Sequence, residues 1–181
     1  MSESAEQMFE ELQQQYYQAW FRFHPERAVE VGVNDHADEL RSYADDDIGA
    51  LNALNQKLIS ALDEMNAETL AAATQVDFNI LRAAAEIELH EQEERDWRYR
   101  NPAQYVPVNA IYQLLIYPVD EVHKSIKRRL QKTPEYLRGA KAQLSQYPEL
   151  VVPIWLNSTI DECRSSISFI RDLVLPPLLT Q

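Results

Sequence analysis

The chain has 181 residues, a formal net charge of −12 and an apolar fraction of 45%, which together indicate a folded globular protein. An acidic chain is repelled by phosphate backbones and anionic lipid, so we expect no nucleic-acid partner and no membrane partner. The sequence contains no run of eighteen apolar residues, so it predicts no membrane-spanning helix. A single cysteine, Cys163, rules out an intramolecular disulfide, and a polar N-terminus without a leader-like pattern favours a cytoplasmic location.

Helical periodicity dominates the sequence, and the first predicted helix begins near Ser4. Ser4 and Gln7 have capping-box spacing. Pro25 ends this helix because it cannot continue the hydrogen-bond ladder, and it begins a short helix, “PERAVEV”, which Gly32 ends. The apolar face of the first helix consists of Met8, Phe9, Leu12, Tyr16, Ala19, Trp20 and Phe23.

A polar connection, “VNDHADELRSYADDD”, leads to a third predicted helix over residues 46–65. A fourth helix is predicted to begin at Thr69 or Thr74 and to run to Arg98. Its first half is apolar on a broad face, so we expect that half to be buried and the charged second half to lie in solvent. The apolar positions are Ile48, Leu51, Leu54, Leu58, Leu62 and Met65 in the third helix, and Val76, Ile80, Leu81, Ala84 and Ile87 in the fourth.

Prolines mark the turns in the second half of the chain. “NPAQYVP” interrupts the helices, Pro118 separates two short ones, and Thr133 with Pro134 predicts the N-terminus of another. The last helix is predicted from Pro153 to Val174, followed by “LPPLLTQ”. The sequence therefore predicts an all-α fold, an antiparallel multi-helix array with short proline-marked turns, forming a single domain over residues 1–181. The stripe of the last helix consists of Ile160, Cys163, Ile167, Ile170 and Val174.

The segment “LHEQEERDW” begins like the zinc-protease motif H-E-x-x-H, with His90 and Glu91 in the first two positions. Glu94 stands where the second histidine should be, so the motif is incomplete. Charges three and four residues apart, such as Glu91 with Arg95 and Glu94 with Arg98, instead indicate a solvated helix face with ion pairs.

A second candidate metal site is the run “NDHADEL”, which places Asp35, His36, Asp38 and Glu39 close together. A calcium loop requires ligands at alternate positions and a turn glycine, and this run has neither. Loops rich in Asp and Asn are usually capping turns, so we interpret the run as a turn.

The other candidates for chemistry are isolated residues. Cys163 lies on an apolar stripe, so we expect a small buried side chain and not a nucleophile. His24 precedes a proline at a helix break and His123 lies within a helix, and neither belongs to a recognisable catalytic motif. The sequence thus predicts no catalytic, cofactor-binding or metal-ligating residue in this chain.

Four segments follow one another in a distinctive order: “FHPERAVEVGVNDHADEL”, “DFNILRAAAEIEL”, “NPAQYVP” and “RRLQKTPEYLRGAKAQL”. In order and spacing they resemble the N-terminal region of the bacterial family known as domain of unknown function 885, over nearly the whole chain but only the first third of the family's length. That family resembles helical zinc peptidases. Its H-E-x-x-H motif lies beyond the matching region, so the resemblance places zinc in a following C-terminal region and none on “LHEQEERDW”.

This resemblance implies a non-catalytic helical region that forms a wall of a substrate channel and contacts a C-terminal peptidase-like region. An alternative is a stand-alone helical module that dimerises or binds a protein partner through its last helix. In both cases the apolar surface of the last helix, extended by Leu173, Leu175, Leu178 and Leu179, is the expected contact surface.

Overall fold

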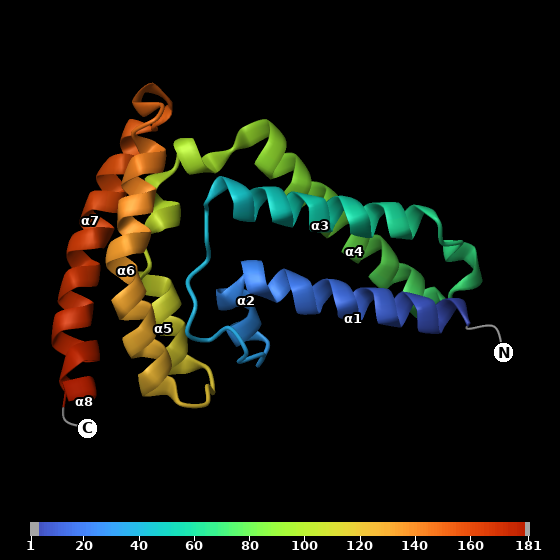
Figure 1. The fold of residues 1–181 in the computed structure, drawn as a ribbon, viewed down its shortest axis with the longest axis horizontal. Coiled ribbons are helices and arrows are strands. Elements are labelled where there is room, and N and C mark those ends of the chain that lie inside the picture. The colour runs from blue at the N-terminus through green and yellow to red at the C-terminus, as the bar shows by residue number, and fades with distance from the viewer. Residues whose placement is uncertain (1–3, 180–181) are drawn as a thin grey trace. The chain divides into compact units, whose positions relative to one another are not determined.

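The computed structural model describes residues 4–179, and every regular element among them is helical (Figure 1). The predicted all-α fold is therefore confirmed. Contacts within the chain group the helices into two compact units, and each unit is assembled from two separate segments. Unit 1 comprises Met1–Phe23 and Ala44–Asp96, and unit 2 comprises His24–Tyr43 and Trp97–Gln181.

Unit 1 is built from three long helices that pack on one another in alternating directions (Figure 1). The first begins with the predicted capping box: the Ser4 hydroxyl accepts from the Gln7 amide at 3.2 Å, and the Gln7 side chain accepts from the Ser4 amide at 3.1 Å. The elements of unit 1 are α1 (Ala5–Phe23), α3 (Asp45–Asp63), η1 (Ala67–Thr69), α4 (Ala72–His90) and the π-helical turn η2 (Glu91–Arg95).

A buried polar chain joins these three helices. The Tyr16 hydroxyl donates to Asn55 Oδ1 at 2.8 Å, and Asn55 Nδ2 donates to Glu88 Oε2 at 3.0 Å. Trp20 Nε1 donates to the same carboxylate oxygen at 2.9 Å. Burial, together with the charge of Glu88, raises the pKa of Tyr16, so its hydroxyl stays a donor. The apolar core around this chain consists of Phe9, Leu58, Leu62, Leu70, Phe78, Leu81 and Ala85.

The prediction of which face of α4 is buried is wrong at most of the predicted positions. Leu81 is buried, but Val76, Ile80 and Ile87 are 56%, 61% and 59% exposed. The helix instead buries Phe78, Leu81 and Ala85, the face that also directs Glu88 toward Asn55. The outer face keeps its apolar side chains in solvent, so α4 is apolar on both sides.

The fourth helix also ends earlier than the predicted Arg98. The α-helical part stops at His90, a π-helical turn follows to Arg95, and Asp96 has a φ of +26°. A positive φ breaks the helix, because side chains other than glycine avoid that region. Arg98 is consequently not on the solvated face: it is 8% exposed and donates to the Tyr43 carbonyl at 3.2 Å.

Unit 2 begins with the short helix predicted at Pro25, which ends before Gly32, where φ is +83°. The four predicted segments after residue 96 are all helical in this unit. Its elements are α2 (Pro25–Glu30), η3 (Trp97–Tyr99), η4 (Pro102–Tyr105), α5 (Val108–Ile116), α6 (Val122–Leu144), η5 (Pro148–Leu150), α7 (Pro153–Phe169), the π-helical turn η6 (Ile170–Val174) and α8 (Leu175–Leu179).

The predicted helix start at Thr133 is wrong, because α6 runs unbroken through Pro134. Thr133 does not cap a helix; its hydroxyl donates to the Arg129 carbonyl at 2.8 Å, one turn back. α6 contacts α5, η3 and η4, with Arg129 bonded to Ala110 before the proline and Tyr136 bonded to Gln104 after it. These contacts outweigh the local cost of the proline.

The core of unit 2 lies between α2, α5, α6 and the end of the last helix. Arg129 of α6 is fully buried, donates to the Ala110 carbonyl of α5, and has its pKa lowered by burial. The apolar core residues are Val29, Ala37, Ile111, Leu114, Ile126 and Val174. Leu175–Leu179 continue the last helix, although the sequence suggested an end at Val174.

Candidate functional site

The outer face of α7 carries several exposed apolar side chains. Leu156, Ile160, Cys163 and Ile167 recur at steps of four and three, which places them on one side of the helix. Leu156 and Ile160 are each 42% exposed and Ile167 is 63% exposed. We call these four residues the α7 stripe.

The inner face of α7 is polar instead of apolar. Thr159 and Ser166 are buried, and their hydroxyls donate at 2.7 Å to the carbonyls of Trp155 and Glu162, one turn back. These bonds satisfy the buried hydroxyls, so the polar inner face can be buried where α7 contacts η4. The usual amphipathic arrangement is thus reversed along this part of the helix.

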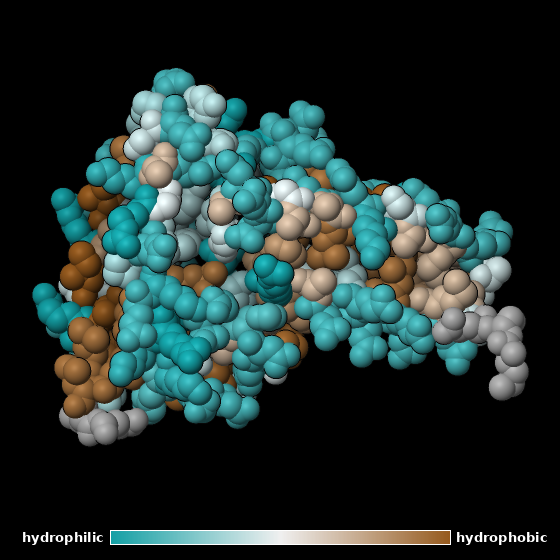
Figure 2. Space-filling view, viewed as in Figure 1, coloured by the Kyte–Doolittle hydropathy of each residue, from teal (hydrophilic) through white to brown (hydrophobic). Residues whose placement is uncertain are grey.

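The apolar surface continues beyond the α7 stripe toward the end of the chain. Figure 2 shows apolar side chains gathered over α7 and α8. Leu173 is 65% exposed and Leu179 is 80% exposed. Single exposed apolar side chains are ordinary, but several gathered along one helix are typical of a contact site.

Cys163 corrects the expectation of a buried thiol, because it lies exposed at the edge of the stripe. Partial burial and the nearby charge of Glu162 raise the pKa of its thiol. The thiol therefore stays protonated at neutral pH, which is unfavourable for a nucleophile.

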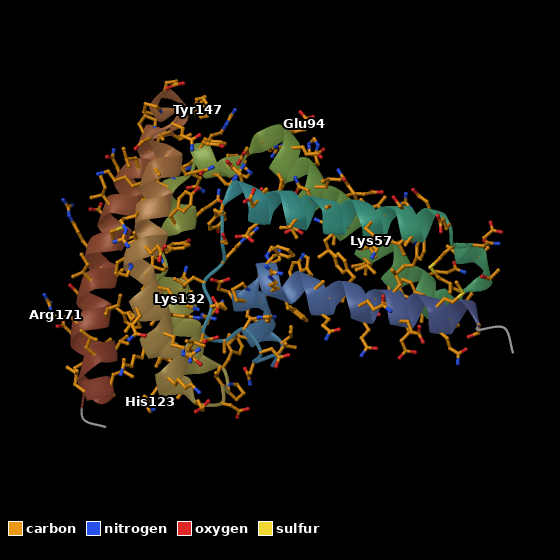
Figure 3. The ribbon with its side chains drawn as sticks, viewed as in Figure 1. Lys57, Glu94, His123, Lys132, Tyr147 and Arg171 are labelled. Atoms are coloured by element: carbon orange, nitrogen blue, oxygen red, sulfur yellow. The ribbon has the colours of Figure 1, made fainter. Side chains whose placement is uncertain are left out.

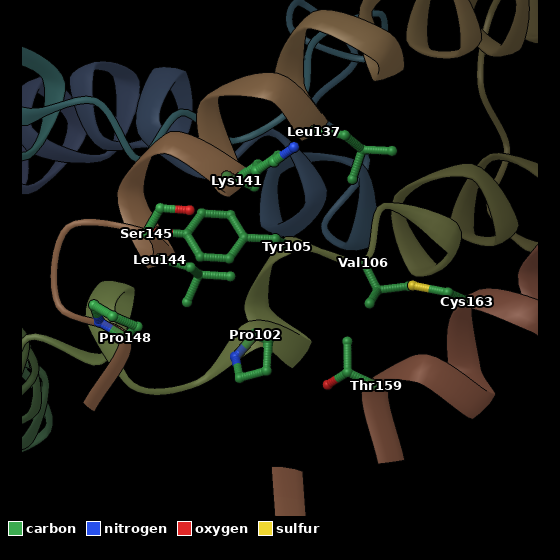
Figure 4. A pocket seen from close by; sticks show the side chains of 11 residues that line it. Pro102, Tyr105, Val106, Leu137, Lys141, Leu144, Ser145, Pro148, Thr159 and Cys163 are labelled. Carbon is green, nitrogen blue, oxygen red and sulfur yellow. The ribbon is translucent and has the colours of Figure 1, made fainter. Parts of the chain in front are cut away.

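An apolar groove of about 530 Å³ lies beside Cys163, between α6 and α7 (Figure 4). Both helices contact η4, whose residues Pro102 and Tyr105 line the groove. The residues lining the groove come from η4 and the following turn, the second half of α6, η5, and α7. They are Pro102, Tyr105, Val106, Leu137, Ala140, Lys141, Leu144, Ser145, Pro148, Thr159 and Cys163.

The floor of the groove is rigidly held. Asn101 caps η4 by accepting from the Ala103 amide at 3.1 Å. The Tyr105 hydroxyl donates to the Arg98 carbonyl at 3.0 Å, and the Tyr105 ring packs against Tyr43 and Tyr136. The groove is therefore a formed feature of unit 2, and its floor holds its place by hydrogen bonds and ring contacts.

The sequence segment with the incomplete zinc-protease pattern lies at the end of α4 and in η2. His90, Glu91 and Glu94 are all exposed, and Figure 3 shows Glu94 in this segment. Among residues 4–179, no group of three or more His, Cys, Asp or Glu side chains is arranged to hold a metal ion.

The “NDHADEL” loop is tied to α6 by ion pairs. Asp38 accepts from Arg128 at 2.6 Å, and Lys132 contacts Glu39 at 2.6 Å and the Asp38 carbonyl at 3.2 Å. The backbone closes turns within the loop, with the Ala37 amide donating to the Asn34 carbonyl at 3.0 Å. The acidic side chains that sequence reasoning considered as metal ligands thus fasten a turn to a helix.

We predict that replacing Arg128 by Ala costs about half a kcal/mol at neutral pH, as for exposed ion pairs. Partial burial acts to raise the pKa of Asp38, but the Arg128 hydrogen bond and the Lys132 charge lower it overall. A lowered folded-state pKa stabilises the protein above the unfolded-state pKa of about 4, and this stabilisation is lost as the pH falls further. The difference between wild type and Arg128→Ala should therefore shrink toward zero below about pH 4.

Urea unfolding between neutral and acidic pH measures this difference. Lys127→Ala is the control, because Lys127 is the exposed neighbour of Arg128 and its loss changes the net charge equally. A pH-independent cost, or the same cost for Lys127→Ala, would show that the ion pair with Asp38 is not responsible.

The two remaining histidines have different surroundings. His24 is 4% exposed and lines a polar cavity of about 220 Å³ together with Glu26, Arg41 and Tyr136. Burial raises the pKa of Tyr136. His123 is exposed in the first turn of α6 (Figure 3). The structure does not bring the two histidines into one site.

No protein-family model and no curated protein matches this chain. A similar solved structure is that of a protein from Shewanella oneidensis whose description is “a putative lipoprotein of unknown function”. The two structures align with a TM-score of 0.82 over 96% of this chain at 14% sequence identity. The chain spans 31% of that protein's length. At this identity the similarity shows a shared helical fold and nothing about activity.

None of the helices in residues 4–179 combines the length and the apolar character that crossing a bilayer requires.

Proposed function

We propose that this chain is the non-catalytic N-terminal helical region of a zinc-metallopeptidase-like protein, related to domain of unknown function 885. In this proposal it forms a wall of a substrate channel and docks against a C-terminal region of the same polypeptide, which would carry the zinc. The order of the four sequence segments supports the family, and the similarity to part of a protein about three times longer is consistent with it.

The observation that carries the docking proposal is the exposed α7 stripe. Ile160 and Ile167 are each β-branched, held on a rigid helix and open to solvent, so they can be covered with little loss of side-chain freedom. Covering apolar area contributes roughly 25 cal/mol per Å². The outer face of α4, with Val76, Ile80 and Ile87, offers a surface of the same kind in unit 1.

A stand-alone module that pairs with a copy of itself is the second candidate, and the same stripe favours it. A two-fold symmetric dimer would bury one surface patch on both partners, and a straight apolar stripe on one helix suits that geometry. In this case the other copy would cover Ile160 and Ile167.

Sequencing the gene beyond the codon for Gln181 is the first test. A reading frame that continues to an H-E-x-x-H segment supports the proposal, and a stop codon after Gln181 contradicts it. In the first case, residues 1–181 and the downstream polypeptide should form a one-to-one complex on co-expression.

Two paired substitutions test the surface. Ile160→Asp with Ile167→Asp should weaken the complex by about tenfold or more, because buried charge at the centre of an interface is costly. Ser158→Asp with Ser165→Asp adds the same charge at the same spacing on exposed positions outside the stripe and should have little effect. Light scattering on residues 1–181 alone at rising concentration shows whether the second candidate, the dimer, forms. A complex that tolerates both pairs equally would rule out the α7 stripe as the docking surface.

A further inference from the structure

The groove between α6 and α7 has a chemistry distinct from the α7 stripe. Its floor is formed by Tyr105 and Ala140, which are 4% and 6% exposed. Leu137 on the α6 wall remains 43% exposed, so the protein itself leaves part of this apolar wall uncovered. The volume of about 530 Å³ lies within the range of about 300–1,000 Å³ found for small-molecule sites.

The polar groups in the body of the groove already have partners. The Thr159 hydroxyl donates to the Trp155 carbonyl at 2.7 Å, and the Tyr105 hydroxyl donates to the Arg98 carbonyl at 3.0 Å. A peptide segment laid in the groove would bury backbone amides and carbonyls against apolar walls, which is costly without partners. An alkyl chain has no such groups, so the lining favours an alkyl chain over a peptide.

The rim carries one charged side chain among the lining residues. Lys141 lies on the α6 wall in its last turn, and Ser145, the C-cap residue of that helix, also lines the groove (Figure 4). A cation with a hydroxyl one turn away suits a carboxylate. This local positive charge contrasts with the net charge of −12 of the whole chain.

We propose that the groove binds a long-chain carboxylate, with its alkyl chain between α6 and α7 and its carboxylate at Lys141. The Cys163 thiol faces the same groove from α7, so a bound chain covers it (Figure 4). This proposal does not rest on the proposed function: it requires no downstream region, and of the α7 stripe it involves only Cys163, at the edge that borders the groove.

Protection of Cys163 from alkylation tests the proposal directly, because it is the only cysteine in the chain. Dodecanoate below its micelle concentration should slow the reaction of Cys163 with a maleimide in a saturable manner. Dodecyltrimethylammonium, with the same chain length and a positive head, should protect less, although an acidic protein attracts cations in general. An unchanged rate with dodecanoate, or stronger protection by the cation, overturns the proposal.

Substitutions locate the binding, measured by calorimetry with dodecanoate. Cys163→Trp fills the groove and should abolish binding, whereas Ile167→Trp places the same ring one turn along on the outer face and should not. Lys141→Glu should weaken binding about fivefold, with Lys127→Glu as the matched charge reversal elsewhere on α6. Circular dichroism checks that each variant keeps its helices.

Two further outcomes overturn the proposal. Binding that survives Cys163→Trp would place the ligand elsewhere, on the α7 stripe for example. Alkylation that slows with rising protein concentration, without any ligand, would mean that a second copy of the chain covers the groove.

Discussion

Replacing Leu81 by Ala is expected to lower the free energy of unfolding by about 2–5 kcal/mol, the range for truncating a large side chain in a packed core. Leu81 is 2% exposed and belongs to the core cluster of unit 1 with Phe78 and Ala85. Removing its branched end leaves a cavity between three long helices, which the buried hydrogen bonds of Asn55 hold in place. The site therefore has little freedom to collapse, which favours the upper part of the range.

The neighbouring residue is the matched control. Ile80 is 61% exposed on the outer face of α4, so Ile80→Ala should remain within about half a kcal/mol of wild type, as should Glu93→Ala in the exposed π-helical turn. Urea unfolding followed by circular dichroism measures all three. Equal losses at Leu81 and Ile80 would mean that α4 buries its other face.

This pair of positions shows what the sequence could and could not predict about α4. The existence of the helix followed from periodicity, but Phe78, Leu81 and Ala85 form an apolar stripe just as Val76, Ile80 and Ile87 do. Periodicity cannot decide between two apolar faces. The choice is made by tertiary partners, because the inner face also carries Glu88, which accepts hydrogen bonds from α1 and α3.

Sequence signals for helix ends were reliable where bonds and backbone angles within a few residues are enough to set the end. Ser4 with Gln7, and Pro25 with Gly32, set helix ends through bonds and backbone angles within a few residues, so these predictions are confirmed. At Pro134 the local signal failed, because α6 is held on both sides of the proline: Arg129 donates to the Ala110 carbonyl of α5, and the Tyr136 hydroxyl donates to the Gln104 carbonyl of η4. A local preference gives way where packing contributes more.

The candidate surfaces differ in how visible they were in the sequence. The apolar stripe of the last helix predicts its exposed apolar surface. The same stripe predicts a buried Cys163, because apolar stripes usually face the core, but the thiol is exposed. The groove had no sequence signal. Its lining comes from η4 and the turn after it, α6, η5 and α7, and most of the lining residues are apolar types that also occur in helical cores. These segments lie far apart in the sequence, so only the folded chain brings them together.

The acidic loop shows the same dependence on distant partners. Asp38 and Glu39 suggest metal ligands in the sequence because they lie close to Asp35 and His36, although the run is better interpreted as a turn. Their partners, Arg128 and Lys132, lie about ninety residues later on α6. Spacing within a loop therefore does not distinguish a cation site from a set of ion pairs with another element.

Replacing Leu114 by Ala should lower the free energy of unfolding by about 2–5 kcal/mol, and should do so in one transition that both units share. Leu114 is 1% exposed in the core of unit 2, while its neighbour Leu115 is 49% exposed and provides the control as Leu115→Ala. The chain passes between the units after residues 23, 43 and 96, so neither unit is a continuous segment. For this reason we expect residues 1–181 to unfold as the single domain that the sequence predicts.

The tryptophans allow each unit to be followed separately. Trp20 lies in unit 1, and Trp97 and Trp155 lie in unit 2, where their rings pack at 5.5 Å between centroids. In a background of Trp97→Phe and Trp155→Phe, the fluorescence of Trp20 reports on unit 1 alone. Leu114→Ala, although located in unit 2, should then shift the urea midpoint read by Trp20 as much as the midpoint read by circular dichroism. A Trp20 midpoint that stays in place while the helical signal of unit 2 is lost would mean that the two units unfold independently, and that two domains share this chain.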